Sequence, residues 1–143
     1  FNSKEICEFL INDMKMFHGI GKCNNITIPK EIYCNWDLAK HSIRGIVDTD
    51  GSVFVSKKPG IEKYPCIELT TTSKNLLEQL RTRLTQRGFR VTARLEKRIK
   101  KNPNALPSFK LALNGEKNLQ KWVDEIGFSN PYKYNRAINY LKF

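Results

Sequence analysis

The chain has 143 residues, of which 40% are hydrophobic, and this length and composition exclude a disordered polypeptide and predict one compact domain. Its 25 Lys and Arg residues against 14 Asp and Glu residues give a net charge of +11, which predicts a polyanionic partner. No apolar run reaches the ~18–20 residues of a membrane span and no signal segment is recognisable, so we expect no membrane association and favour nucleic acid.

The cysteine and histidine content argues against a zinc site. The cysteines are far apart in the sequence, without a Cys-x-x-Cys pair, and only two histidines accompany them. We therefore expect reduced, mostly buried thiols in an intracellular (cytoplasmic or organellar) protein. The residues concerned are Cys7, Cys23, Cys34, Cys66, His18 and His41.

The first third of the chain predicts two helices joined by an arm. Apolar residues recur at helical spacing over Ser3–Phe17, with Ser3 as a plausible N-cap. The segment Gly19–Pro29 is rich in glycine and asparagine and predicts a loop or arm. Asp37–Asp48 then predicts a second helix, which ends before Gly51.

After Gly51 the apolar residues change from helical to alternating spacing. Ser52–Lys57 and Pro65–Thr72 are rich in β-branched residues and predict a hairpin. Ser73–Arg87 places four leucines on one face behind a capping serine and ends at Gly88, which predicts a helix.

The same order then repeats. Phe89–Ile99 and Ser108–Asn114 alternate as strands, Glu116–Ile126 has helical spacing, and a last helix is expected after Pro131. Together these elements predict an α+β fold of αββαββα order, an antiparallel sheet with helices on one face. We divide the chain into an N-terminal helix and arm, residues 1–35, and a main domain, residues 36–143.

The segment Ile43–Gly51, with the sequence IRGIVDTDG, carries the functional signal. A helix ends in two carboxylates, Asp48 and Asp50, directly before a strand. This segment resembles the signature of LAGLIDADG homing endonucleases, although Ile43 and Arg44 replace the usual Leu-Ala. An EF-hand calcium loop is excluded because its twelfth position would be Pro59. Family-like strings also occur at residues 64–72 and 126–131.

The resemblance implies a paired metal site. Leu38, Ser42, Gly45 and Thr49 lie on one helical face and most are small, so another helix backbone can approach closely there. In the family two such helices cross, each delivering its last Asp, so the resemblance implies Mg²⁺ bound by Asp50 with Thr49 beside it. Two such ions about 4 Å apart would support phosphodiester hydrolysis.

The resemblance also implies a basic residue near the scissile phosphates. Lys133 is the best positional match for this catalytic role, with Lys110 and Lys57 as alternatives. Thr71 stands where many family members carry Gln, so the resemblance implies a different network of water molecules around the metal.

The predicted strands share one polar face that is suited to double-stranded DNA. The window Arg81–Lys101 carries nine Lys or Arg residues against one acid. A twisted antiparallel ribbon can lie in the major groove, where arginine reads guanine and polar side chains read other bases. The residues that we expect to contact DNA are Ser56, Lys58, Glu68, Thr70, Arg90, Thr92, Arg94, Arg98 and Lys110.

These observations predict a Mg²⁺-dependent, site-specific DNA endonuclease that acts as a homodimer on a roughly palindromic site. One alternative is that this chain is one half of a two-motif enzyme, with residues 3–32 as the tail of a preceding repeat. The other is a non-catalytic DNA-binding regulator or an RNA-splicing maturase on the same scaffold.

Overall fold

A computed structural model gives the fold of the chain and describes all residues except 1–3, 17–18, 97–103, 105 and 143. From residue 36 on, the described elements follow the predicted order of helices and strands, whereas the predicted arm before it carries two short helices that were not predicted. In chain order they are α1 (Lys4–Glu8), η1 (Phe9–Asp13), α2 (Lys22–Asn25), α3 (Lys30–Tyr33), α4 (Trp36–Asp50), β1 (Gly51–Lys58), β2 (Ile61–Thr71), α5 (Lys74–Gln86), β3 (Val91–Glu96), β4 (Ser108–Asn114), α6 (Glu116–Glu125) and α7 (Pro131–Leu141).

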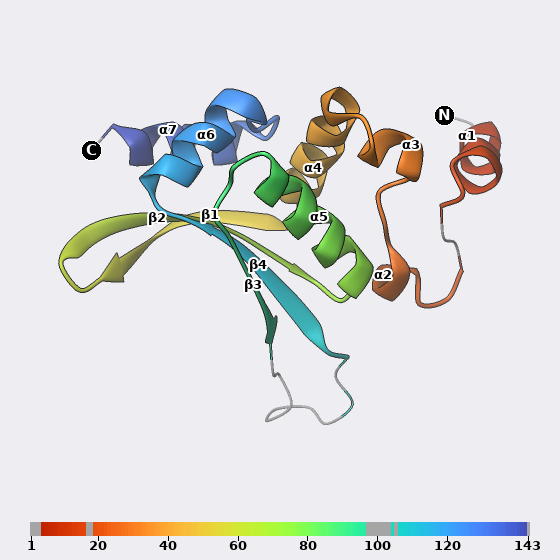
Figure 1. The fold of residues 1–143 in the computed structure, drawn as a ribbon, viewed down its shortest axis with the longest axis horizontal. Helices are drawn as coiled ribbons and strands as arrows, with labels where there is room; N and C mark the ends of the chain where they lie inside the picture. Colours follow the sequence, from red (N-terminus) through yellow and green to blue (C-terminus); the bar gives the residue numbers. More distant parts are fainter. Residues whose placement is uncertain (1–3, 17–18, 97–103, 105, 143) are drawn as a thin grey trace.

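The four strands form one antiparallel sheet in the order β1-β2-β4-β3. Val53 pairs with Ile67, Ile67 with Leu113, and Leu113 with Val91, so an apolar row crosses all the strands. Helices α4, α5 and α6 lie on one side of the sheet, which leaves its other side uncovered in Figure 1. The α+β prediction, with helices on a single face, is therefore confirmed.

The core between the sheet and the helices is built from aliphatic side chains around one tryptophan. Trp122 is fully buried, contacts Phe89 edge-on at 6.2 Å between ring centroids, and donates its indole N–H to the carbonyl of Gly127 at 3.0 Å. Leu80 and Leu84 of α5 are each 1% exposed. Burial of each such side chain stabilises the fold by about 1.5–3 kcal/mol.

Helix α4 is longer than predicted at both ends. Asn35 is its N-cap and accepts a hydrogen bond from the Asp37 amide at 3.0 Å. The helix continues to Asp50, and β1 starts at the next residue. A Cβ atom on Gly51 would lie 2.6 Å from the carbonyl oxygen of Val47, so only glycine fits this turn without displacing the backbone. Asp50 is therefore the final helical residue.

The arm before α4 is docked on α5, and its structure corrects part of the prediction. The side-chain amide of Gln79 accepts from the Ile28 N–H at 2.7 Å and donates to the Ile28 carbonyl at 3.0 Å. Ser73 donates to the Ile26 carbonyl at 2.7 Å, and Ile28 is buried in the core. The predicted continuous helix over residues 3–17 is wrong, because a short α-helical segment passes into a π-helical turn that ends at Asp13.

None of the helices in the described part of the chain has the length and apolar character needed to span a bilayer.

Candidate active site and nucleic-acid interface

The two carboxylates at the end of α4 point in different directions. One oxygen of Asp48 accepts a hydrogen bond from the Ser129 amide at 2.8 Å, and its other oxygen is buried without a hydrogen-bond partner among the described residues. Asp50 is exposed, and none of the hydrogen bonds or ion pairs found for the described part of the chain involves its carboxylate. Asp48 therefore ties the helix to the turn before α7, whereas Asp50 faces outward.

Lys133 lies against the same helix end. Its ammonium donates hydrogen bonds to the carbonyl oxygens of Val47 and Asp48, both at 2.7 Å. A cation at the C-terminal end of a helix is stabilised by the partial negative charge of the unpaired carbonyls. Asn130 caps α7 by accepting from the amides of Tyr132 and Lys133. Lys133 thus places a positive charge on the carbonyls of the residues three and two positions before Asp50 in the sequence.

A hollow of about 280 Å³ opens beside Asp50. Thr49 does not line this hollow. Its hydroxyl is within hydrogen-bonding distance of the carbonyls of Gly45 and Ile46, both at 3.1 Å. Thr71 does line the hollow and accepts from the Ser73 amide at 3.1 Å. The remaining lining residues are Cys23, Ile26, Ile46, Leu69, Thr70, Thr72 and Leu76.

The small face of α4 lies open. Leu38 is 49% exposed, Gly45 and Thr49 are exposed, and Ser42 is half-buried. A Cβ atom on Gly45 would meet no other atom within 4 Å. The opposite face of the helix carries the buried residues Ala39, Ile43 and Val47. Helix α4 therefore packs on the core by one face and leaves the other exposed.

The donor set at Asp50 suits a hard cation but is incomplete in one described chain. Mg²⁺ prefers oxygen ligands and is commonly held by one or two carboxylates plus substrate phosphates. Among the described residues, no group of three or more His, Cys, Asp or Glu side chains lies close enough to hold a metal ion. Any metal at Asp50 thus needs ligands from outside this set, such as a second carboxylate or a phosphate.

The strand residues predicted to contact DNA share the uncovered face of the sheet. Thr92 pairs with Ala112, Arg94 with Lys110, and Thr70 with Lys110, so the register brings these side chains to one side. Thr92 and Arg94 are exposed, while the side chains of Ser56 and Thr70 are half-buried.

Two described residues of the predicted interface, Arg90 and Lys58, occupy other surroundings. Arg90 precedes β3, and its backbone N–H and carbonyl both bond to the Asn118 side chain. The ammonium of Lys58 lies 3.8 Å from the centre of the Tyr64 ring. Arg98 lies outside the described residues.

Lys110 is engaged by two acids, which weakens its case as the lysine at the scissile phosphate. Its ammonium lies 3.1 Å from a carboxylate oxygen of Glu68 and 3.0 Å from one of Glu96. Hydrogen bonds that Lys110 donates to Glu96 and then to Glu68 raise its pKa above the ordinary 10.5, against a smaller opposing effect of burial. The pairing of Glu96 with Lys110 depends on the strand register.

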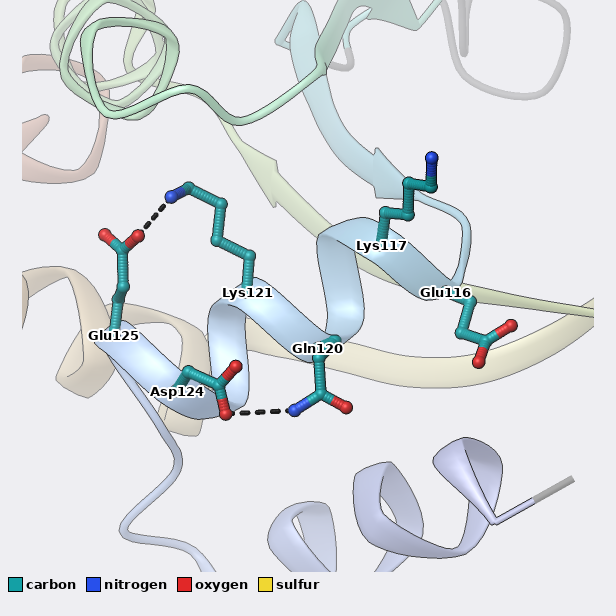
Figure 2. A pocket seen from close by; sticks show the side chains of 6 residues that line it. All are labelled: Glu116, Lys117, Gln120, Lys121, Asp124 and Glu125. Carbon is teal, nitrogen blue, oxygen red and sulfur yellow. Dashed lines mark hydrogen bonds and ion pairs between the residues drawn. The ribbon is translucent and has the colours of Figure 1, made fainter.

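A second hollow, along α6, offers no comparable chemistry. Figure 2 shows that its side chains pair with one another: Lys121 with Glu125, and Gln120 with Asp124 at 2.9 Å. All six lining residues belong to one helix and none belongs to the motif. We read this surface as a solvated helix face.

The thiols differ from expectation in their exposure. Cys66 is buried, but Cys7, Cys23 and Cys34 are exposed, so the prediction of mostly buried thiols is wrong. All are free, as expected. The ring of His41 bonds to Arg44 at 2.8 Å, and His18 lies outside the described residues.

Known proteins share both the sequence pattern and the fold. The chain is 32% identical over 141 residues to a replication factor C small subunit of Methanocaldococcus jannaschii and 25% identical over 132 residues to one of Pyrococcus horikoshii. These matches cover 99% and 92% of the chain but only 7% and 12% of the relatives, so the chain spans a small part of their length.

A solved structure resembles the fold. It is a crystal structure of the homing endonuclease I-CvuI in complex with the I-CreI target, with a TM-score of 0.53 and 15% sequence identity. The likeness covers 75% of this chain and 66% of that chain. In sequence, the family described as LAGLIDADG-like domain matches residues 37–127, which include the motif, the sheet and helices α5 and α6. The chain therefore belongs to the LAGLIDADG-like domain family.

Proposed function

We propose that the chain is a Mg²⁺-dependent endonuclease that cuts both strands of a DNA duplex, with Asp50 as the metal-binding catalytic carboxylate. The observation that carries this proposal is the outward-facing Asp50 at the end of a helix whose small face is open. Membership of the family supports the nuclease class.

Two copies of the motif are needed for the reaction. A described chain supplies one exposed carboxylate at the helix end and no complete group of metal ligands. The face formed by Leu38, Ser42, Gly45 and Thr49 would pack against the same face of a second copy, which brings the two Asp50 side chains together. A homodimer with this symmetry cuts a roughly palindromic site.

Different residues of the chain then have different roles in the reaction. Bound Mg²⁺ would activate a water and offset the negative charge of the phosphate. The Asp50 carboxylates hold the metal, and Lys133, fixed at the end of α4, adds positive charge close to them. The uncovered sheet face receives the duplex, with Thr92 and Arg94 exposed toward it.

The decisive experiment is cleavage of a randomised duplex library in the presence of Mg²⁺. Asp50→Asn should abolish cleavage while preserving DNA binding, because the amide keeps the shape but loses the charge that binds the metal. Asp124→Asn is the matched control, since Asp124 is exposed on α6 and accepts a hydrogen bond from Gln120 of the same helix. Equal cleavage by the Asp50 variant refutes the catalytic assignment.

The same material distinguishes the alternatives. Binding without cleavage by the native chain supports a non-catalytic regulator or maturase. Sedimentation of the protein with DNA tests the pairing of two chains. A strictly monomeric, inactive species overturns the homodimer and supports one half of a two-motif enzyme.

A further inference from the structure

Helix α7 carries a row of two tyrosines and one arginine along one side. Tyr132, Arg136 and Tyr140 recur every four residues, so they are neighbours on the helix surface. Arg136 donates its Nε–H to the Tyr140 hydroxyl and an Nη1–H to the Tyr132 hydroxyl, both at 2.9 Å. The central carbon of its guanidinium lies 5.3 Å from the centre of the Tyr132 ring and 5.7 Å from that of Tyr140. We call these three residues the α7 ladder.

Helix α7 lies on the same side of the sheet as α6 (Figure 1), and it packs on α6 and β1. Ala137, on the face of α7 that packs inward, is fully buried. Tyr132 is 66% exposed and Arg136 is half-buried, so the core does not account for their position. Tyr132 directly precedes Lys133, whose ammonium lies on the carbonyls at the end of α4. The α7 ladder therefore begins beside the helix end that carries Asp50.

The α7 ladder presents hydrogen-bond donors and a positive charge to its surroundings. The remaining N–H groups of Arg136 take part in no hydrogen bond found for the described residues. Each tyrosine oxygen already accepts from Arg136, so its own O–H hydrogen is directed elsewhere and can donate. In the described part of the chain, no carboxylate forms an ion pair with Arg136. This combination suits an anion that has several acceptor oxygens.

A phosphate group fits these donors well. The planar guanidinium of arginine binds two phosphate oxygens at once, and tyrosine hydroxyls are among the groups that contact phosphates in protein–DNA complexes. Two hydrogen bonds and two flanking rings hold Arg136 in place, so little side-chain freedom is lost on binding. The net charge of +11 favours nucleic acid over an acidic protein segment as the source of the anion.

We propose that the α7 ladder binds the sugar-phosphate backbone of duplex DNA near the end of α4, as a contact that holds the duplex without reading its sequence. This inference rests on the proposed function, because it needs a duplex that reaches the end of α4. Arg136 supplies the charge and a fork of N–H donors. Tyr132 and Tyr140 orient the guanidinium and donate from their hydroxyls.

The salt dependence of duplex binding, measured in EDTA on a pool of random sequences, tests the proposal. Each phosphate contact contributes about 0.9 to the slope of log affinity against log salt concentration. Arg136→Gln should therefore reduce this slope by about 0.9 and weaken binding equally for all sequences. Arg81→Gln is the matched control, since Arg81 is exposed on α5 and pairs with Glu78 at 3.7 Å. Its slope should match that of the native chain.

Three further variants separate the charge from its orientation. Tyr132→Phe and Tyr140→Phe keep the rings and the charge, so each should weaken binding roughly threefold with the native slope. Arg136→Lys should also keep the slope but lose affinity, because an ammonium lacks the planar fork. Circular dichroism verifies that each variant is folded before its affinity is measured.

A native slope in Arg136→Gln overturns the inference. If this variant instead loses binding to polyglutamate, the α7 ladder is a contact for an acidic protein segment. A loss of affinity confined to particular base sequences also overturns the inference, because it would make Arg136 a base-reading residue. A native chain that binds DNA with the expected slopes but never cleaves it contradicts the proposed function and supports the phosphate contact, so the two failures are distinguishable.

Discussion

The ammonium of Lys133 donates a hydrogen bond to the backbone carbonyl of Asp48 at 2.7 Å, while the side chain of Asp48 accepts one from Ser129 at 2.8 Å. Two hydrogen bonds thus join the end of α4 to residues 129–133, in the turn before α7 and at the start of that helix. The position of the helix end that carries Asp50, and the positive charge near it, depend on these two hydrogen bonds.

Replacing Lys133 by Met should lower the free energy of unfolding by about 1–3 kcal/mol, because two helix carbonyls lose a charged donor. Urea denaturation measures this change. Under the proposed function, cleavage at saturating DNA should also fall by more than the loss of folded protein explains. Lys142→Met, at an exposed lysine just after α7, serves as the control. A Lys133 variant of native stability would show that the two hydrogen bonds contribute nothing.

Asp48→Ala should destabilise the protein by roughly 1 kcal/mol, since the Ser129 amide loses its acceptor. Asp48→Asn should be tolerated better, because the amide oxygen can still accept from Ser129 and the buried unpartnered oxygen of the carboxylate is no longer charged. Thermal denaturation of both variants compares them directly. The reverse order of stability would contradict this account of Asp48.

Gly45 tests the open face of α4. Gly45→Ala should stabilise the monomer by about 0.5–1 kcal/mol, because the added methyl meets no atom within 4 Å and alanine favours the helix. Gly45→Leu should leave the monomer folded but prevent close approach of a second helix, which shifts sedimentation toward the monomer. Thr85→Leu adds a leucine at an exposed position of α5 as the control. Unchanged association of Gly45→Leu would exclude this face as the dimer contact.

Gln79 tests whether the arm is part of the domain. Gln79→Ala removes both hydrogen bonds to the Ile28 backbone and should cost about 1–3 kcal/mol. Hydrogen exchange should show faster exchange of the Ile28 amide, while Gln120→Ala, on the exposed face of α6, leaves it protected. Equal protection in both variants would mean that Gln79 does not hold the arm.

The ion pairs of Lys110 predict a dependence of stability on alkaline pH. Because folding raises the pKa of Lys110 above 10.5, its stabilising effect is fully present below that pH and is lost as the pH rises through the folded pKa. The difference in unfolding free energy between the native chain and Lys110→Gln should therefore shrink as the pH rises above about 10.5. A difference that is constant over this range would contradict the assignment.

The order of elements was predictable because each signal is local. Apolar spacing, the capping serine before α5 and the glycines after the helices specify helices and strands within a few residues of where they lie. The two faces of the sheet followed from alternation, and the register confirms that Thr92 and Arg94 share one side with Lys110.

The contacts that depend on distant parts of the chain were not predictable. Gln79 meets Ile28 and Lys133 meets Val47 only after the chain has folded, and nothing in the local sequence indicates either pair. The exposure of the thiols was not predictable for a related reason. Composition favours the burial of cysteine, but Cys23 and Cys34 lie in the arm and its short helices, which pack on the outside of other elements and leave these thiols exposed. The roles of Asp50 and Thr49 remain predictions from the motif.

The junction at Gly51 has a mechanical consequence. Since α4 passes into β1 without an intervening loop, and the turn has no space for a side chain, the helix end and the edge of the sheet move as one rigid piece. In a pair of such chains, the separation of the two Asp50 carboxylates would then be governed by the angle between the two sheets. A duplex that bends to fit both sheets would set that angle. The fit between DNA and protein far from the cut would therefore determine the distance between the two Asp50 carboxylates.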